Sequence, residues 1–219
     1  MQPRRTEAKA MKYILSYLFA IIFLNVAAQQ SSDAELVRKT FTHYKKAILE
    51  GKGAEAVKWV DSKTISYYDS ILNLSIHGDS AAIQDLDIIS KLTVLTVRHR
   101  IPVEEVLTMT GHEFFIYSID KGMIGKNSVR TIEIGEVKLE GNFANGQLVA
   151  GGQQSPIYFQ FNKEEGTWKL DITSLFPVSN EGLTKMIAED GSTDNEFIFK
   201  TLEMLTGKPV TDQVWKPLK

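Results

Sequence analysis

The spacing of apolar residues changes twice along this chain, and these changes constrain the fold more than any other feature. Between residues 37 and 119, most apolar residues recur every three or four positions, as on one face of a helix. Between residues 132 and 172 they alternate with polar residues, and helical spacing returns near residue 183. This order is typical of an α+β fold, in which N-terminal helices pack on a curved antiparallel sheet and extra helices follow at the C-terminus.

Short motifs predict where individual helices begin and end. Asp79-Ser80 opens a helix that continues past Leu92 and breaks before Pro102, because proline removes a backbone donor and restricts the preceding residue. Two later helices are expected to begin at capping boxes, in which a threonine and a glutamate three residues on satisfy each other's backbone amides. These motifs are Thr110-x-x-Glu113 and Thr193-x-x-Glu196.

Glycines punctuate the region of alternating residues. The parity of the apolar residues flips at Gly135, which predicts a β-bulge and a bent strand. Two turn motifs follow, Gly141-Asn142 and Asn145-Gly146. The first is the predicted hairpin turn, because a turn at the second would leave only a stub of strand before Gly151.

The last predicted hairpin has one apolar face and one polar face. Trp168, Leu170 and Ile172 alternate with Lys169 and Asp171. The alternation therefore predicts that Asp171 points away from the core and pairs with Lys169 or a neighbouring strand. A carboxylate in contact with water is not activated as a base by desolvation, so Asp171 is not a predicted catalytic residue. The same outer face suggests a homodimer contact through Tyr158, Gln160, Lys169 and Asp171.

The N-terminus has the pattern of a secretory signal peptide. Met11-Lys12 precedes an uncharged apolar run over residues 13–26, and Val26-Ala27-Ala28 supplies small residues before a cleavage point. We expect residues 1–28 to be removed, with Met11 as a possible true start, and residues 29–219 to form one periplasmic or secreted domain without a membrane anchor. The alternative is that the segment remains as an uncleaved anchor.

Composition excludes several classes of function. The chain contains no cysteine, which rules out disulfides, cysteine-linked lipids, thiol nucleophiles and cysteine metal sites. Removing residues 1–28 takes away four basic residues and one acidic residue, and leaves 21 basic and 26 acidic residues. A mildly acidic domain without a basic stripe is a poor partner for nucleic acid, because phosphate binding needs clustered positive charge.

Several segments together resemble the nuclear transport factor 2-like superfamily. Residues 37–59 and 65–72 resemble its opening helices, and Phe159-Gln160-Phe161 followed by residues 166–171 is similar to its last hairpin. Residues 207–208 and 215–218 look like the tail of an exported bacterial subgroup. The resemblance implies a cone-shaped α+β barrel with an interior pocket. Residues 79–121 add helix to the usual pattern, and this addition either fills the pocket or forms a lid over it.

The histidines do not form a metal motif. His43, His77 and His99 stand alone, and His112-Glu113 begins like a zinc-protease motif but has Ile116 where the second histidine is needed. Serine-nucleophile elbows and glycine-rich phosphate loops are also absent from the sequence. We therefore predict no catalytic residue, no metal and no cofactor.

Two groups of residues are candidates for ligand binding. The cluster Arg98-His99-Arg100 lies at a helix end, where it either complements the helix dipole or forms an anion subsite. Aromatic residues either form an ordinary core or line an apolar pocket whose hydroxyl and indole groups orient a ligand. These aromatic residues are Tyr44, Trp59, Tyr67, Tyr68, Tyr117 and Trp168. The residues chosen as ligand-binding candidates are Tyr44, Tyr68, Arg98, His99, Arg100 and Trp168.

Three hypotheses of function follow from the sequence. The first is an exported non-catalytic domain that binds a small apolar or envelope-derived ligand, or a protein partner. The second is a small isomerase- or hydrolase-like enzyme that uses His99 or His112 with an aromatic hydroxyl in the cavity that contains Trp168. The third is a structural homodimer that associates through the outer face of the sheet.

Overall fold

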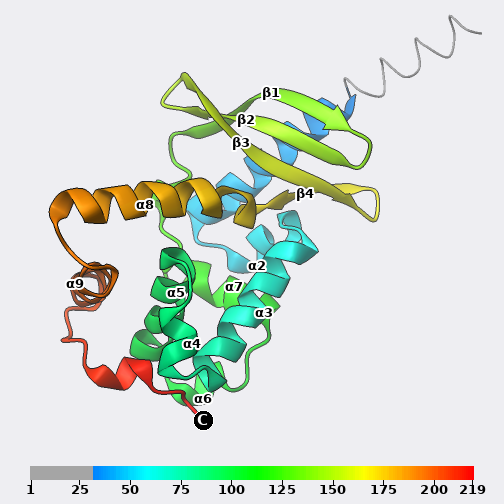
Figure 1. Ribbon diagram of the computed structural model, residues 1–219. Helices are drawn as coiled ribbons and strands as arrows, with labels where there is room; N and C mark the ends of the chain where they lie inside the picture. Colours follow the sequence, from blue (N-terminus) through cyan, green and yellow to red (C-terminus); the bar gives the residue numbers. More distant parts are fainter. Residues whose placement is uncertain (1–31) are drawn as a thin grey trace, which may run out of the picture.

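The computed structural model describes residues 32–219, which form a layer of helices packed against a four-stranded antiparallel sheet (Figure 1). The predicted α+β fold is thereby confirmed, whereas the predicted signal peptide lies outside the described residues. Residues 32–50 form the first described helix. The other elements are α2 (Gly53–Ala56), η1 (Val57–Trp59), α3 (Ser62–His77), α4 (Ser80–Gln84), α5 (Ile88–Arg100), α6 (Val103–Val106), α7 (Gly111–Asp120), η2 (Lys126–Ser128), β1 (Ile132–Glu140), β2 (Phe143–Ala150), β3 (Gln153–Glu164), β4 (Thr167–Asp171), η3 (Ile172–Leu175), α8 (Phe176–Asp190), α9 (Asp194–Thr206) and η4 (Asp212–Trp215).

The sheet is a simple meander in the order β1-β2-β3-β4. Its register shifts between Ile134 and Val137, which confirms the bulge predicted at Gly135. Glu140 pairs with Phe143, so the first turn lies at Gly141-Asn142 as predicted, and Gly141 has the positive φ of 62° that this turn requires. A bulge of this kind bends the strand locally and increases its twist.

The helix over residues 32–50 crosses the sheet and is fastened to it at both edges. Arg38 Nε donates to the carbonyl of Gly135 at 3.0 Å and Lys45 Nζ donates to that of Ile132 at 2.8 Å, both on β1. Thr40 Oγ1, which is almost fully buried, donates to the carbonyl of Trp168 on β4 at 3.0 Å. The core between helix and sheet is built from large side chains at or below 2% exposure: Phe41, Phe161, Trp168 and Leu170.

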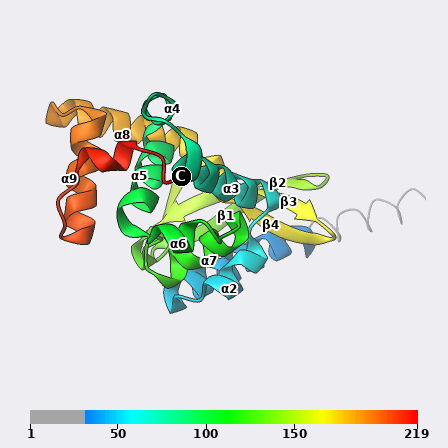
Figure 2. The same ribbon diagram turned by 90° about the horizontal axis from the view of Figure 1, so that it is seen from below.

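A second layer of helices, α3, α5 and α7, lies below the sheet in Figure 1, and α7 lies beside α2 when seen from below in Figure 2. Close packing in this layer depends on Gly111, the first residue of α7. Its amide donates to the carboxylate of Asp69 on α3, and a Cβ at this position would lie 2.5 Å from Asp69 Cγ. Only glycine permits this approach of α7 to α3.

The segment after Asp79 differs from the single helix predicted there. It forms α4 and then α5, with a break at residues 85–87. The break arises because the Asp87 side chain accepts from the Ser90 amide at 3.1 Å and caps a new helix. The end before Pro102 and the capping boxes of α7 and α9 are confirmed.

The C-terminal helices form an arm that extends away from the sheet (Figures 1 and 2). α8 is held to the start of α5 by Asn180, whose Oδ1 accepts from the Ile89 amide at 3.0 Å and whose Nδ2 donates to Asp87 at 2.8 Å. On α9, Ile198 and Leu202 are buried, whereas Leu205 is 56% exposed. No helix within residues 32–219 is both long and apolar enough to cross a membrane.

Candidate functional site

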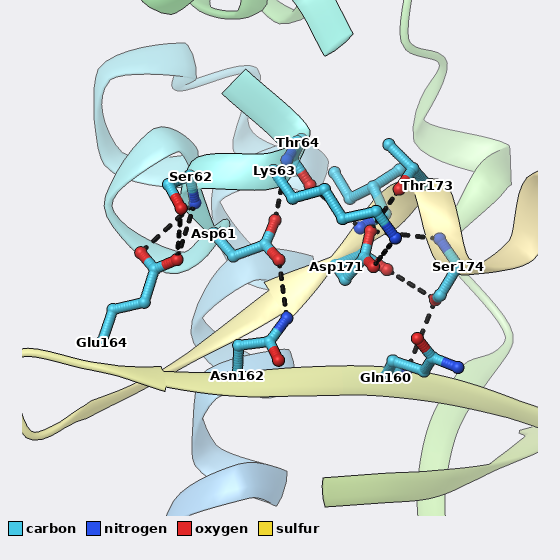
Figure 3. Close-up of polar contacts among 11 residues, drawn as sticks. Asp61, Ser62, Lys63, Thr64, Gln160, Asn162, Glu164, Asp171, Thr173 and Ser174 are labelled. Carbon is cyan, nitrogen blue, oxygen red and sulfur yellow. Dashed lines mark hydrogen bonds and ion pairs between the residues drawn. The ribbon is translucent and has the colours of Figure 1, made fainter. Parts of the chain in front are cut away.

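The most polar buried region joins the start of α3 to β3, β4 and η3 (Figure 3). Asp61 and Asp171, each 1% exposed, are its centre. Asp61 accepts from the Thr64 amide and from Asn162 Nδ2, both at 2.8 Å, and so caps α3 and joins it to β3. Two buried carboxylates close to one sheet edge are candidates for acid–base catalysis. Their hydrogen-bond partners decide whether either carboxylate is free to exchange a proton with a substrate.

Asp171 does not lie on a solvated outer face beside Lys169, and that prediction is wrong. Its Oδ1 accepts from Thr173 Oγ1 at 2.5 Å and from the Ser174 amide at 3.1 Å, while its Oδ2 accepts from Lys63 Nζ at 2.8 Å. Strand alternation does turn Asp171 away from Trp168, but the N-terminus of α3 covers that face at the end of β4. The partner is therefore Lys63 on α3 rather than Lys169.

This polar region is a structural joint. The oxygens of both aspartates are occupied by protein donors, and Glu164 accepts from the hydroxyl of Ser62 at 2.6 Å, which fixes the same junction from β3 (Figure 3). A buried carboxylate whose hydrogen bonds are satisfied locally gives the fold specificity and leaves little capacity to bind a ligand. The homodimer hypothesis also loses Asp171 from its outer face.

The three residues of the cluster Arg98-His99-Arg100 contact different parts of the fold. Arg98 donates to the carbonyls of Leu74, Ser75 and Gly78 at the end of α3, and to that of Val214, at 2.5–3.1 Å. Burial lowers the pKa of Arg98, as expected for a cation removed from water. Arg98 therefore caps another helix and is not free to bind a ligand.

The other two residues of this cluster point elsewhere. His99 Nε2 lies 3.0 Å from Thr206 Oγ1 and connects α5 to α9. Arg100 makes one long hydrogen bond, 3.3 Å to the carbonyl of Lys121, and lines a small cavity. Of the three cluster residues, only Arg100 has the placement of an anion-binding residue. Within residues 32–219, no three histidine, aspartate or glutamate side chains gather in a way that could hold a metal ion.

An apolar cavity of about 310 Å³ lies between the two layers of helices and the sheet. α3 and α5 form one wall, β3, β4 and η3 form another, and the start of α8 closes a side. α5 belongs to the helical addition between residues 79 and 121, so this addition supplies a wall of the cavity. The lining residues are Tyr44, Tyr67, Tyr68, Ile89, Thr93, Ile124, Ser128, Val129, Phe159, Leu170, Ile172, Leu175, Phe176 and Ser179.

Three tyrosines supply polar groups to this apolar cavity, in addition to the hydroxyls of Thr93, Ser128 and Ser179. The Tyr67 hydroxyl is buried and has no hydrogen-bond partner among the described residues. Burial raises the pKa of Tyr44 and of Tyr68 far above the usual range, and the nearby Tyr44 and Tyr67 add to the shift at Tyr68. The three phenols therefore lie near one another and remain neutral, each able to donate and accept a hydrogen bond.

The Tyr67 ring is held rigidly although its hydroxyl is unsatisfied. Its centroid lies 5.6 Å from that of Tyr68 and 4.9 Å from that of Phe176 on α8, both in edge-on contact. Burial raises the pKa of Tyr67, and the hydroxyls of Ser90 and Thr93 lie close enough to oppose this shift. Neither forms a hydrogen bond of normal geometry with the Tyr67 hydroxyl. Ser90 donates to Asp87 and Thr93 donates to the carbonyl of Ile89, so neither hydroxyl donates to Tyr67.

A hollow of similar size, about 320 Å³, lies on another side of the helix over residues 32–50, next to its C-terminal half, and charged side chains surround it. Lys52 in its wall pairs with Glu50 at 2.7 Å, and Glu55 in its wall pairs with the neighbouring Lys58 at 2.7 Å. His43 and Trp59 stack on each other there, with centroids 4.5 Å apart. Paired surface charges offer a ligand little net attraction, so this hollow is the weaker candidate.

The structure thus separates the six predicted ligand residues. Tyr44 and Tyr68 line the cavity, Arg100 lines its neighbour, and Arg98 and His99 join helices. Trp168 is a core residue whose indole Nε1 donates to Asp33 at 3.3 Å, and it is not among the residues that line either cavity. Tyr67, named in the sequence as aromatic only, is the residue whose unsatisfied hydroxyl marks the site. The signal in the sequence that could have indicated Tyr67 as a site residue was its position next to Tyr68.

Replacing Tyr67 with phenylalanine is expected to raise the free energy of unfolding of the ligand-free protein by about 1 kcal/mol, because the variant no longer buries an unsatisfied hydroxyl. Urea denaturation checks this expectation. Tyr158→Phe, on the half-buried outer face of β3, is the control and should change the value by less than about 0.5 kcal/mol. A loss of stability in Tyr67→Phe would mean that Ser90 or Thr93 satisfies the hydroxyl in solution.

Comparison of the chain with protein-family models, with curated proteins and with solved structures found no match. The site is therefore interpreted from its own geometry.

Proposed function

We propose that this chain is an exported, non-catalytic binding domain of the nuclear transport factor 2-like type, which holds a small apolar ligand in the tyrosine-lined cavity. The observation that carries the proposal is the combination of a cavity of about 310 Å³ with the buried, unpartnered hydroxyl of Tyr67. A buried hydroxyl without a hydrogen-bond partner lowers the stability of the fold, and such groups persist in proteins mainly where they serve a function such as ligand binding. The apolar signal segment of the sequence supports a periplasmic or secreted location.

The size and lining of the cavity suit a compact apolar molecule with one or two polar atoms. Ligand pockets begin near 300 Å³ and are mostly apolar, with a few polar groups that fix orientation. At bulk density the same volume would hold about ten water molecules, which would find few partners on walls of isoleucine, leucine, valine and phenylalanine. An apolar ligand gains by displacing that water and by accepting a hydrogen bond from Tyr67.

A histidine-based enzyme has weaker support. Neither His99 nor His112 is among the residues that line the two cavities, and the hydroxyl neighbours of His99 are structural. General acid–base catalysis needs the side chain within hydrogen-bond reach of the reacting group. The aspartates nearest the sheet edge are occupied in the joint described above. Binding without chemistry is therefore the proposal that the arrangement of these residues favours.

N-phenyl-1-naphthylamine, an uncharged apolar dye that fluoresces away from water, tests the proposed function. We expect a saturable rise in fluorescence with one dye per chain. Ser179 lies on α8 at the rim of the cavity, so Ser179→Trp should place a large side chain across it and weaken binding about tenfold.

Thr184→Trp is the matched control, because Thr184 is exposed on the same helix but does not line the cavity. Its dissociation constant for the dye should stay within about twofold of that of the unmodified protein. The proposed function fails if the unmodified protein shows no saturable binding, or if both tryptophan variants bind the dye equally well.

A further inference from the structure

A second, smaller cavity of about 180 Å³ adjoins the tyrosine-lined cavity. Tyr68, Thr93 and Ile124 line both, so the two spaces are neighbours across these side chains. The smaller cavity lies among α5, α7 and α9, and Arg100, the last residue of α5, is one of its lining residues. A ligand that extended from the larger cavity into the smaller one would come within reach of this guanidinium group.

Arg100 has unused binding capacity. A guanidinium has five N–H donors, and the only hydrogen bond that Arg100 forms with the described residues is the long one to the Lys121 carbonyl. No carboxylate of residues 32–219 pairs with it within 4.0 Å. Arg98, two residues earlier, shows the opposite state, since four carbonyls surround its guanidinium.

Both acidic and basic side chains lie near Arg100, but Arg100 is the one positively charged residue among the described residues that line the smaller cavity. Lys121 holds its ammonium 5.5 Å from the centre of the Tyr117 ring and does not line the cavity. Burial raises the pKa of Tyr117, Glu105 raises it further and Arg100 opposes both, so an acidic and a basic side chain flank this ring. The other polar lining residues are Tyr68, Thr93, Thr96 and Ser118, whose hydroxyls are neutral.

Resting on the proposed function, we infer that the ligand is an amphiphile with an apolar body in the tyrosine-lined cavity and an anionic oxygen head group at Arg100. A guanidinium matches the paired oxygens of a carboxylate or a phosphate and forms charge-assisted hydrogen bonds with them. The three phenols then contact the body, where Tyr67 donates to a polar atom of the ligand, and they do not contact the anionic head group. This division explains why one part of the site is apolar with neutral donors and the other presents an unpaired cation.

Three ligands with the same ten-carbon chain test the inference by calorimetry on the purified protein: decanoate, decyl phosphate and decanol. We expect at least one anion to bind about tenfold more tightly than decanol. Whichever anion binds better identifies the head group. Arg100→Gln should remove this preference and leave decanol binding unchanged, whereas Lys121→Gln, the neighbouring cation that does not line the cavity, should keep the preference within about twofold.

The outcomes separate the inference from the proposed function. If the anions and decanol bind equally, or if Arg100→Gln keeps the preference, the inference is wrong and the apolar site stands. If none of the three binds while the naphthylamine dye does, the inference is again wrong. If neither these ligands nor the dye bind, the proposed function itself fails.

Discussion

Replacing Arg98 with alanine is expected to lower the free energy of unfolding by about 3 kcal/mol. The guanidinium donates to four backbone carbonyls, three of them at the C-terminal end of α3 and one in η4. Removing it leaves half-buried acceptors without their donors and detaches η4 from the helices. Each hydrogen bond from a charged group contributes about 1.5–3 kcal/mol, and incomplete burial reduces the total. Urea denaturation at constant pH measures the change.

Arg100→Ala is a matched control for this prediction, because the same residue type is removed two positions away on the same helix. Arg100 makes one hydrogen bond of 3.3 Å, so the variant should differ from the unmodified protein by less than about 0.5 kcal/mol. Equal destabilisation by both variants would contradict the division of the cluster between a structural and a binding residue. Arg98→Lys should recover only part of the loss, since an ammonium cannot reproduce the planar fork.

Arg98, His99 and Arg100 have different partners in the structure, and the sequence could not predict this difference. Three adjacent residues look like one cluster in a sequence, but successive side chains on a helix point about 100° apart. The sequence placed the cluster correctly at a helix end, and it could not show that Arg98 would cap α3 or that His99 would contact α9. Those partners lie 20 or more positions away along the chain.

Local signals predicted most of the fold. The turn at Gly141, the bulge at Gly135 and the capping boxes of α7 and α9 depend on backbone conformation and on residues within a few positions. The break before α5 is also local, yet it was missed. Its signal is Asp87 three residues before Ser90, since an aspartate here can cap a helix as Asp79 caps α4.

The burial of side chains at the ends of helices and strands was less predictable from the sequence, because it depends on which other element packs against that end. Alternation along β4 correctly turned Asp171 away from the core residues Trp168 and Leu170. It carried no information on whether water or another element meets the opposite face, and α3 meets it. Tyr44 and Tyr68, two of the predicted ligand-binding residues, line the larger cavity. The empty space beside them is a property of the assembled layers and has no sequence pattern.

Replacing Trp168 with alanine is expected to lower the free energy of unfolding by about 4 kcal/mol, the largest effect predicted for a single residue. The Trp168 side chain is 2% exposed, and its indole Nε1 donates to Asp33. The ammonium of Lys163 lies over the indole, 5.4 Å from the ring centroid. Removing the indole leaves a cavity in the layer between the sheet and the helix over residues 32–50, and large-to-small changes of this kind cost about 3–5 kcal/mol. Thermal and urea unfolding both measure the loss.

Trp59→Ala provides the comparison, because Trp59 is only partly buried and stacks on His43 at the surface. Its cost should be nearer 1 kcal/mol. Trp168→Phe keeps most of the apolar contacts, so this variant should remain folded and bind the naphthylamine dye with an unchanged dissociation constant. A change in dye affinity would place Trp168 in the ligand site, as the sequence suggested. An unchanged affinity together with a large loss of stability in Trp168→Ala would identify Trp168 as a residue that supports the fold and does not contact the dye.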